Sequence, residues 1–228
     1  MKMVFQGLED AFLIERGIPF VFEVNNPVLF ARLCQSFEGN EGEFAVEPYT
    51  LWEDDERVNP KNKFLLIANV FDLPWDTRGS AGAVHKQIES ILFESEEIRL
   101  AIEQLNASIR KRCFEGSYAF YADYAFGEEW DLKRYLKAFA FDVDYNKEEP
   151  LLDNLIKFLS YIADIRFRGI LVFVNLCSFL AERELEELLE HSFFLGLPLV
   201  LLESDTKSYQ LSRGIHYRID QELLGEYV

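Results

Sequence analysis

The stretch GILVFVNLCSFLAERELEELLEH, residues 169–191, indicates the fold class of this chain. Six of the seven residues from 170 to 176 are apolar, and a Glu-rich segment with helical spacing follows. A short continuous apolar run before an amphipathic helix is typical of a buried strand in a parallel sheet. In nucleotide-binding sheets such a strand ends in an Asp for magnesium, whereas this strand ends in Asn175, Cys177 and Ser178.

The same alternation of apolar runs and helical patterns continues on both sides of this stretch. The sequence predicts strands at 19–24, 43–49, 63–73 and 197–204, a short edge strand at 215–220, and a polar loop at 52–62. It predicts helices over 25–37, where Asn26 precedes Pro27, over 148–166, and over 181–196 with Gly196 at the end. Apolar strands separated by helices predict an α/β fold with a parallel sheet covered on both faces.

The middle of the chain has a different pattern. Pro, Gly and Ser cluster in PWDTRGSAGAV, residues 74–84, which indicates a boundary. Apolar residues then recur at three- and four-residue spacing over 83–112, which predicts one or two long helices turning near Glu94 and Ser95, and a short helix follows at 128–141. We therefore predict an α/β head domain from residues 1–77 and 141–228, with an inserted helical domain of residues 78–140.

Composition narrows the class of protein. The chain has 228 residues, of which 49% are hydrophobic and 21 are Phe, so it can bury a core. No apolar run is long enough to span a bilayer, and the first residues do not resemble a leader peptide. Three scattered cysteines form neither a disulfide framework nor a zinc motif. These features predict a cytoplasmic protein with reduced cysteines.

The charge is unevenly distributed. The net charge is -17, and residues 1–77 and 141–228 each contribute -8, whereas residues 78–140 contribute only -1. The bases of the middle are therefore candidates for contacts with DNA phosphates: Arg78, Lys86, Arg110, Lys111, Arg112, Lys133, Arg134 and Lys137. Bases near a helix C-terminus also complement the helix dipole, and the charges alone do not distinguish these interpretations. Any DNA contact would be to the backbone and independent of sequence.

Enzymatic chemistry has little support in the residues. A phosphate-binding loop needs GxxxxGK[ST] after the first strand, but the corresponding segment reads VFEVNNPVLFARL, without glycine or lysine. The three histidines, His85, His191 and His216, are far apart and form no metal or catalytic motif. Cys177 follows a strand but lacks a nucleophile-elbow motif, so we interpret it as a buried structural thiol.

Carboxylates flank the short basic helix of the middle segment. Asp123, Glu128, Glu129 and Asp131 could provide oxygen ligands for calcium, although the sequence contains no EF-hand loop. Acids at a helix start and a solvated acidic surface are the ordinary alternatives.

The strand end VNLCSFL, the acidic helix after it and the strand LPLVLLES together resemble the CRISPR-associated spacer-acquisition proteins of type II-A systems, a ring-forming family that binds double-stranded DNA. The resemblance covers about residues 150–205, and the order of elements elsewhere is similar. It implies a head domain with a degenerate P-loop-like core, a helical leg, and a ring of four subunits through which linear duplex DNA threads. It also implies bound calcium near the junction of leg and head, no catalytic activity, and work beside the CRISPR integrase pair and the RNA-guided nuclease.

The residues and the resemblance together leave three classes of function open. The first is a non-catalytic ring that binds the ends of double-stranded DNA during CRISPR adaptation in antiviral defence. The second is a divergent P-loop-like nucleotide enzyme on the same sheet. The third is an acidic protein-interaction module that does not bind DNA.

Overall fold

A computed structural model describes residues 1–75, 80–205 and 214–228. The chain divides into two compact units. The head unit comprises Met1–Trp75 and Tyr145–Val228, and the helical unit comprises Asp76–Asp144. The predicted boundaries lie within a few residues of these limits, and the role of the helical unit as a leg domain stays a prediction.

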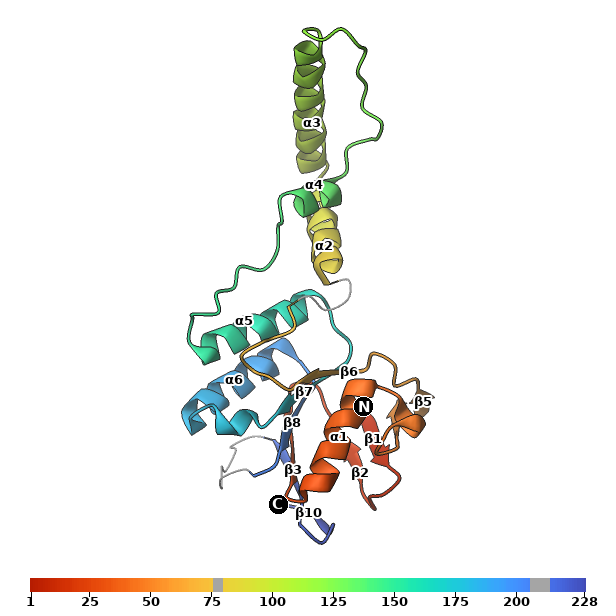
Figure 1. Ribbon diagram of the computed structural model, residues 1–228, viewed down its shortest axis with the longest axis vertical. Helices are drawn as coiled ribbons and strands as arrows, with labels where there is room; N and C mark the ends of the chain where they lie inside the picture. The colour runs from red at the N-terminus through yellow and green to blue at the C-terminus, as the bar shows by residue number, and fades with distance from the viewer. Residues whose placement is uncertain (76–79, 206–213) are drawn as a thin grey trace. The chain divides into compact units, whose positions relative to one another are not determined.

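A six-stranded sheet forms the centre of the head unit (Figure 1). Its order is β10-β9-β3-β8-β7-β6. Its strands are β3 (Phe20–Val24), β6 (Phe64–Ile67), β7 (Ile170–Val174), β8 (Leu199–Glu203), β9 (Ile215–Ile219) and β10 (Gly225–Tyr227). All neighbours pair in parallel except β9 and β10. The α/β class with a mostly parallel sheet is confirmed. The prediction that 215–220 forms an edge strand was wrong, because β10 pairs with β9 and forms the edge instead.

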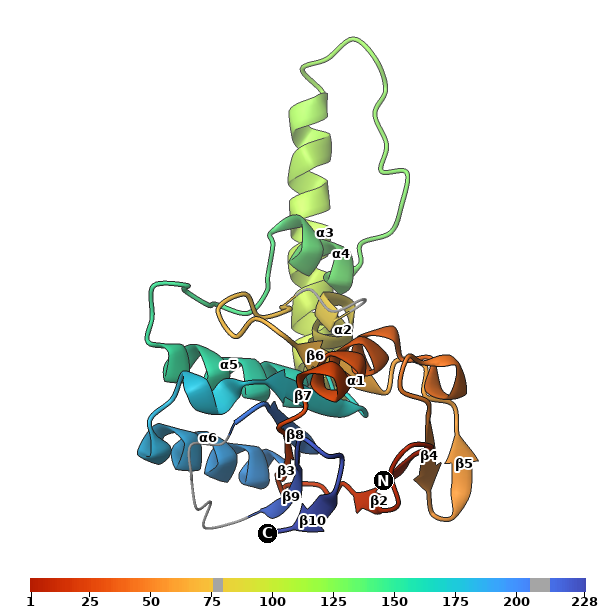
Figure 2. The ribbon, with the colours of Figure 1, turned by 60° about the horizontal axis from the view of Figure 1, so that its bottom comes forward.

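The burial of the strands explains why they read as continuous apolar runs. Every residue of β3 and β8 is buried, because both faces of the sheet are covered by other parts of the head unit. The helix α1 (Pro27–Gly39) lies on one face, and α5 (Leu151–Asp164) and α6 (Glu182–Leu195) lie together on the other (Figures 1 and 2). The end of α6 was predicted correctly, since Gly196 adopts the left-handed conformation with φ of 62°.

A second sheet of the head unit was not predicted. It is antiparallel, with order β2-β1-β4-β5, and consists of β1 (Lys2–Phe5), β2 (Ala11–Leu13), β4 (Tyr49–Glu53) and β5 (Glu56–Val58). The predicted strand at 43–49 instead holds the 3-10 helix Gly42–Phe44, and the predicted loop at 52–62 contains β5. These strands are only partly buried and lack the fully buried apolar runs of β3 and β8, and β1 pairs with β4, which lies far away in the sequence.

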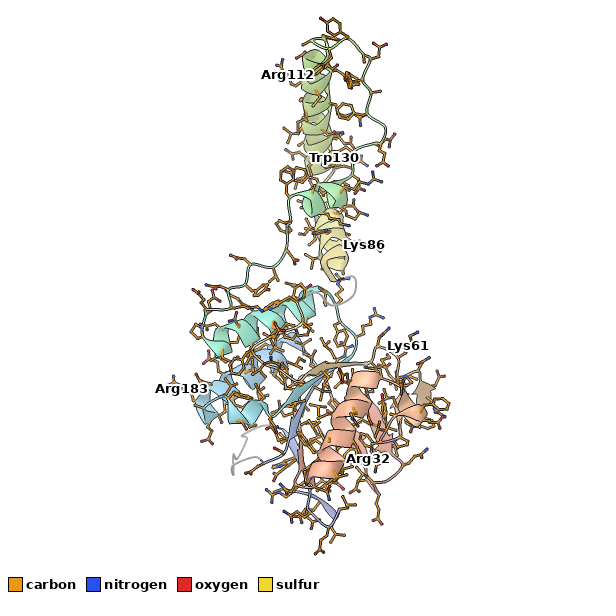
Figure 3. The ribbon with its side chains drawn as sticks, viewed as in Figure 1. Arg32, Lys61, Lys86, Arg112, Trp130 and Arg183 are labelled. Carbon is orange, nitrogen blue, oxygen red and sulfur yellow. The ribbon has the colours of Figure 1, made fainter. Side chains whose placement is uncertain are left out.

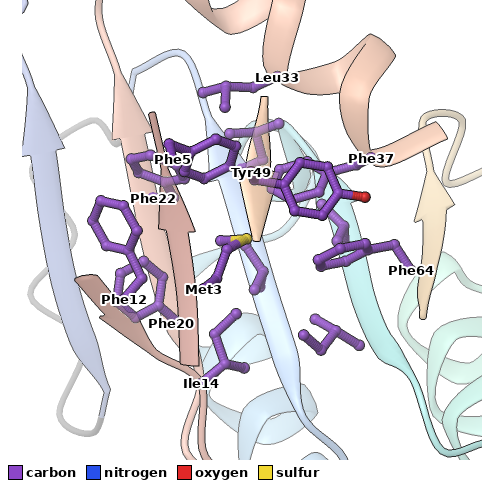
Figure 4. Packing of buried hydrophobic residues seen from close by; sticks show 14 of the residues in the cluster. Met3, Phe5, Phe12, Ile14, Phe20, Phe22, Leu33, Phe37, Tyr49 and Phe64 are labelled. Carbon is purple, nitrogen blue, oxygen red and sulfur yellow. The ribbon is translucent and has the colours of Figure 1, made fainter. Parts of the chain in front are cut away.

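The core lies between the two sheets and α1. Figure 4 shows Met3, Phe5 and Tyr49 of the antiparallel sheet facing Phe22 and other apolar side chains of the parallel sheet. The rings of Phe5 and Phe22 are 6.2 Å apart between centroids, and Phe37 of α1 lies 6.0 Å from Phe5. Six phenylalanines therefore contribute to one continuous aromatic core: Phe5, Phe12, Phe20, Phe22, Phe37 and Phe64.

The helical unit contains α2 (Ser80–Glu94), α3 (Glu96–Ser117) and α4 (Leu132–Ala138). The predicted turn near Glu94 and Ser95 is confirmed, because Ser95 caps α3 with its hydroxyl accepting from the backbone N–H of Ile98 at 3.4 Å. No helix in the described ranges is long and apolar enough to cross a membrane.

Candidate nucleic-acid interface

The predicted DNA-contacting bases that the structure describes are distributed over the three helices of the helical unit. Figure 3 shows Lys86 on α2 and Arg112 toward the C-terminal end of α3, with Trp130 in the segment before α4. Arg110 and Lys111 also lie on α3, and the other three bases lie on α4. Arg78 lies outside the described residues.

Arg110 is held against the segment that follows α3. Its guanidinium carbon lies 4.5 Å from the centroid of the Phe126 ring, a cation–π arrangement. Its Nη1 atom also donates to the backbone oxygen of Glu128 at 3.4 Å. Phe126 in turn contacts Phe114 edge-to-face at 5.3 Å. Arg110 therefore connects α3 to the following loop, which is a structural role.

Four further bases of the predicted DNA-contacting set form ion pairs inside the helical unit. On α3, Glu115 lies 2.7 Å from Arg112 and 4.0 Å from Lys111. Lys133 of α4 pairs with Glu89 of α2 at 2.9 Å, and this hydrogen bond raises the pKa of Lys133. Arg134 pairs with Glu128, completing the set of four. These carboxylates compensate much of the positive charge that the sequence places in this region.

Lys86 and Lys137 differ from the other bases. Both are exposed, and neither makes an ion pair with any residue in the described ranges. A phosphate approaching either ammonium would meet no competing carboxylate contact. Among the predicted DNA-contacting residues that the structure describes, these two lysines are therefore the best candidates for binding a phosphate.

The basic run on α3 does not form one face. Residues 110, 111 and 112 are consecutive in a helix, so their side chains point about 100° apart. Arg110 and Lys111 line a cleft of about 1050 Å³ between α3 and the segment before α4. The same cleft is lined by five carboxylates: Glu89, Glu103, Glu115, Glu129 and Asp131. Its charge is unsuited to a phosphate backbone.

The apolar face of α3 is largely exposed within the described chain. No residue of this 22-residue helix is buried. Ile98, Leu105 and Ile109 are 42%, 66% and 61% exposed, and with Ile102 they form a stripe at helical spacing, the α3 stripe. An amphipathic helix with such a stripe needs another surface to bury it.

Comparison with known proteins identifies the family. Residues 39–223 match the family described as CRISPR-associated protein (Cas_Csn2). The chain belongs to this family. Membership implies a role in CRISPR adaptation and confirms the resemblance read from the sequence. No curated protein matches the chain.

A solved structure has a fold similar to that of this chain. The crystal structure of Stu0660 of Streptococcus thermophilus aligns with a TM-score of 0.57 and 16% sequence identity, over 88% of this chain and 68% of that one. At this identity the likeness concerns the fold alone.

The carboxylates predicted to bind calcium do not fit a shared site in this Cas_Csn2 member. Asp131 caps α4, its Oδ1 accepting from the backbone N–H of Arg134 at 2.8 Å, and Glu128 pairs with Arg134. Asp123 and Glu129 do not complete a metal site with them. The described residues contain no group of three His, Cys, Asp or Glu side chains placed to hold a metal ion. Calcium binding by these four residues stays a prediction.

The strand-to-helix turn that would hold a phosphate is occupied by a side chain. Only Asn25 and Asn26 separate β3 from α1. The Asn26 side-chain oxygen accepts from the backbone N–H groups of Val28 and Leu29 at 3.1 and 3.0 Å. These are the amides that a phosphate-binding helix offers to its ligand. Here the chain's own carboxamide satisfies them.

A buried charge cluster at the C-terminal edge of the sheet was not predicted from the sequence. Glu23 of β3 lies 3.0 Å from His216 and 3.1 Å from Arg218, both on β9. Glu203 of β8 is fully buried, and its Oε1 accepts from the backbone N–H of Cys177 at 3.1 Å. Glu23 and Glu203 sit at paired positions of neighbouring strands. Acids inside apolar runs carry no sequence signal for such a pairing.

The contacts of His85, His191 and Cys177 indicate structural roles for these residues. His85 lies 2.7 Å from the backbone oxygen of Phe141, and His191 lies 2.9 Å from the Ser160 hydroxyl. Burial raises the pKa of the Cys177 thiol, which is 2% exposed. Its predicted burial is confirmed, and a thiol so protonated is a poor nucleophile.

Proposed function

We propose that this Cas_Csn2 protein is a non-catalytic ring that binds the ends of double-stranded DNA during CRISPR adaptation. The α3 stripe is the observation that carries the proposal. Ile98, Leu105 and Ile109 of this stripe are exposed in a single chain, and a second copy of α3 would bury them. Family membership supports the adaptation role.

The charges of the helical unit support contacts to the phosphate backbone. Lys86 and Lys137 carry positive charge that no described carboxylate compensates. A ring with these lysines on its inner wall would place positive charge against the phosphates of the DNA. Such binding would be independent of sequence and steeply dependent on salt.

The head unit supports a structural role for the degenerate P-loop-like core. The first strand of the parallel sheet, β3, lies at its centre and runs directly into α1. Asn26 occupies the helix N-terminus, and Asn175 stands where a magnesium-binding acid would be needed. A head unit without these groups serves assembly and partner binding, and we propose the CRISPR integrase pair and RNA-guided nuclease as its cytoplasmic partners.

The proposal is tested with a linear duplex and a closed circle of the same sequence, across a salt series with and without calcium. We expect binding to the linear form only, weakening steeply with salt, because a ring must thread over an end. Equal affinity for both forms would contradict the ring and indicate an open groove. A calcium requirement would support a metal site completed by a second copy.

A second candidate is an acidic interaction module without DNA binding. The five carboxylates of the cleft beside α3 and the net charge of -17 favour it. A monomer that binds neither form of DNA would support this candidate over the ring. ATP hydrolysis above background would instead support the hypothesis of a divergent P-loop-like nucleotide enzyme.

A further inference from the structure

A small cavity of the head unit contains a buried polar atom that lacks a hydrogen-bond partner. The cavity has a volume of about 280 Å³ and lies beside the first turn of α5. Asn154 lines it, and the Oδ1 atom of this side chain is buried without a partner among the described residues. The apolar residues that line the cavity are Val70, Phe71, Leu73, Trp75, Tyr145 and Leu151. A buried acceptor in such surroundings costs free energy unless a ligand supplies a donor.

The orientation of the Asn154 amide is fixed by its nitrogen. Nδ2 donates to the backbone oxygens of Asn146 at 3.0 Å and of Glu149 at 3.2 Å. Because these two carbonyl groups hold the nitrogen, the oxygen lies on the other side of the amide. The side chain is only 9% exposed, so bulk water has little access to this oxygen. The cavity therefore needs a hydrogen-bond donor.

The charged residues that line the cavity already have partners. The ammonium of Lys147 lies 2.9 Å from Asp72, and the carboxylate of Glu149 lies 2.6 Å from Lys157. A cation or an anion entering the cavity would have to compete with an existing ion pair. Of the lining residues, only Asn154 has a buried side-chain atom without a partner. These groups favour a neutral, apolar ligand that carries one donor.

An aromatic wall and the small volume narrow the ligand further. The rings of Trp75 and Tyr145 stack with their centroids 4.5 Å apart, and Phe158 contacts Trp75 edge-to-face at 5.3 Å. This wall is already in place for another ring to pack against. Sites for small molecules usually have volumes of about 300–1,000 Å³, so this cavity has room for one ring system and not for a nucleotide.

Exposed rings at the edge of the cavity indicate that the ligand belongs to a protein. Phe71, which lines the cavity, contacts Phe179 edge-to-face at 5.2 Å, and the two residues are 61% and 48% exposed. A small molecule that filled the cavity would leave Phe179 in water. A protein surface that inserted one side chain would cover both rings, the usual arrangement around a buried aromatic anchor.

We propose that this cavity receives a tryptophan side chain of a partner protein. The indole N–H donates to Oδ1 of Asn154, and the surface around the tryptophan covers Phe71 and Phe179. Indole suits the cavity better than phenol or imidazole, because indole has a donor and no acceptor to leave unsatisfied. The inference rests on the proposed role of the head unit in partner binding and deepens it, and it does not require DNA binding.

The test uses three probes: indole, 1-methylindole and the capped tripeptide acetyl-Leu-Trp-Leu-amide. Dissociation constants are measured by saturation-transfer difference NMR. We expect indole to bind roughly threefold to tenfold more tightly than 1-methylindole, which lacks the N–H group. The variant Asn154→Leu should bind both ring compounds equally. The tripeptide should bind more tightly than indole, because its leucines cover the exposed rings.

Phe179→Ala separates the edge of the cavity from its interior. We expect this variant to bind the tripeptide severalfold more weakly and indole as tightly as the unsubstituted protein. Phe44→Ala, which removes an 89% exposed ring elsewhere in the head unit, is the matched control and should change neither affinity. The affinity of Phe179→Ala for a linear DNA duplex should be unchanged, so this inference and duplex binding can fail separately.

Three results would overturn the inference. Equal affinities for indole and 1-methylindole in the unsubstituted protein would exclude Asn154 as the acceptor. Binding of indole without binding of the tripeptide would assign the cavity to a free small molecule. A lower oligomeric mass of Phe179→Ala in sedimentation velocity would show that a second copy of this chain covers the rings.

Discussion

The side-chain oxygen of Asn175 accepts two hydrogen bonds from Ser204, one from its backbone N–H and one from its hydroxyl, each at 2.9 Å. Asn175 follows β7 and Ser204 follows β8, so the contact joins the C-terminal ends of two neighbouring strands. Asn175 also adopts a left-handed conformation with φ of 52°. At the position where a nucleotide-binding sheet would carry its magnesium ligand, Asn175 therefore connects two strand ends.

Substitutions at Asn175 should separate its two structural contributions. Asn175→Gly keeps the left-handed conformation accessible and removes both hydrogen bonds, so we expect the free energy of unfolding to fall by about 1–2 kcal/mol. Asn175→Ala adds the strain of a positive φ and should cost about 1 kcal/mol more. Asn175→Asp retains the hydrogen-bond acceptor, so its free energy of unfolding should stay close to that of the unsubstituted protein. Urea unfolding measures all three, and equal losses for Gly and Ala would contradict the strain.

Glu203 should make the stability of the head unit depend on pH. Burial raises its pKa from 4.5 to about 7, partly offset by hydrogen bonds from Cys177, with a further increase from the nearby Glu23. The folded chain thus holds the proton more tightly than the unfolded chain. This contribution to stability is complete below about pH 4.5 and is lost as the pH rises through about 7.

The variant Glu203→Gln tests this dependence. Gln keeps an acceptor for the Cys177 N–H and is neutral at every pH. At pH 5 its unfolding free energy should lie within about 1 kcal/mol of the unsubstituted protein, and at pH 8 it should be about 2 kcal/mol higher. The exposed Glu222→Gln serves as control and should show no such difference between the two pH values. A constant difference for Glu203→Gln across this range would refute the assigned titration.

The α3 stripe should control assembly without affecting the fold of one chain. Leu105 is 66% exposed, so Leu105→Asp removes no contact inside a described core. If a second copy buries it, a charge there should raise the dissociation constant of the assembly by roughly a hundredfold or more. Gln104→Asp places the same charge on the adjacent helical position, off the stripe, and is the control. Sedimentation velocity gives the masses, and an unaltered mass for Leu105→Asp would exclude the stripe from the interface.

The uncompensated lysines should dominate the salt dependence of duplex binding. Lys86→Gln and Lys137→Gln should each lower the slope of log affinity against log salt by about 0.9 or more, since each removes a phosphate contact. Lys61→Gln makes the same charge change in the head unit and should leave the slope unchanged. Affinities measured across a salt series test this, and equal slopes for all four proteins would remove both lysines from the interface.

The parallel part of the fold could be read from the sequence because its signals are local. The apolar run at 170–176, the Asn26–Pro27 helix start and the Gly196 helix end each act within a few residues. The antiparallel sheet could not be read in this way. Its strands are only partly buried, so they carry no fully buried apolar run, and they are held by partners as distant as Phe5 and Tyr49.

The candidate interface was predictable only as a set of charges. The sequence places eight bases near one another in the chain, but their compensation depends on which carboxylate each one meets in space. Glu89 and Lys133 are far apart in the chain and still form an ion pair at 2.9 Å. No sequence rule distinguishes these paired bases from Lys86 and Lys137.

The fold class, the positions of the main helices and the resemblance to a CRISPR-associated family were all readable from the order of residues, because periodicity, capping residues and motifs are properties of neighbouring positions. Two features emerged from the packed chain alone: which charges are compensated, and that Glu203 is a buried acid next to Glu23. Electrostatic and hydrogen-bond energies depend on distance and burial in space, and these arise only when distant segments pack together.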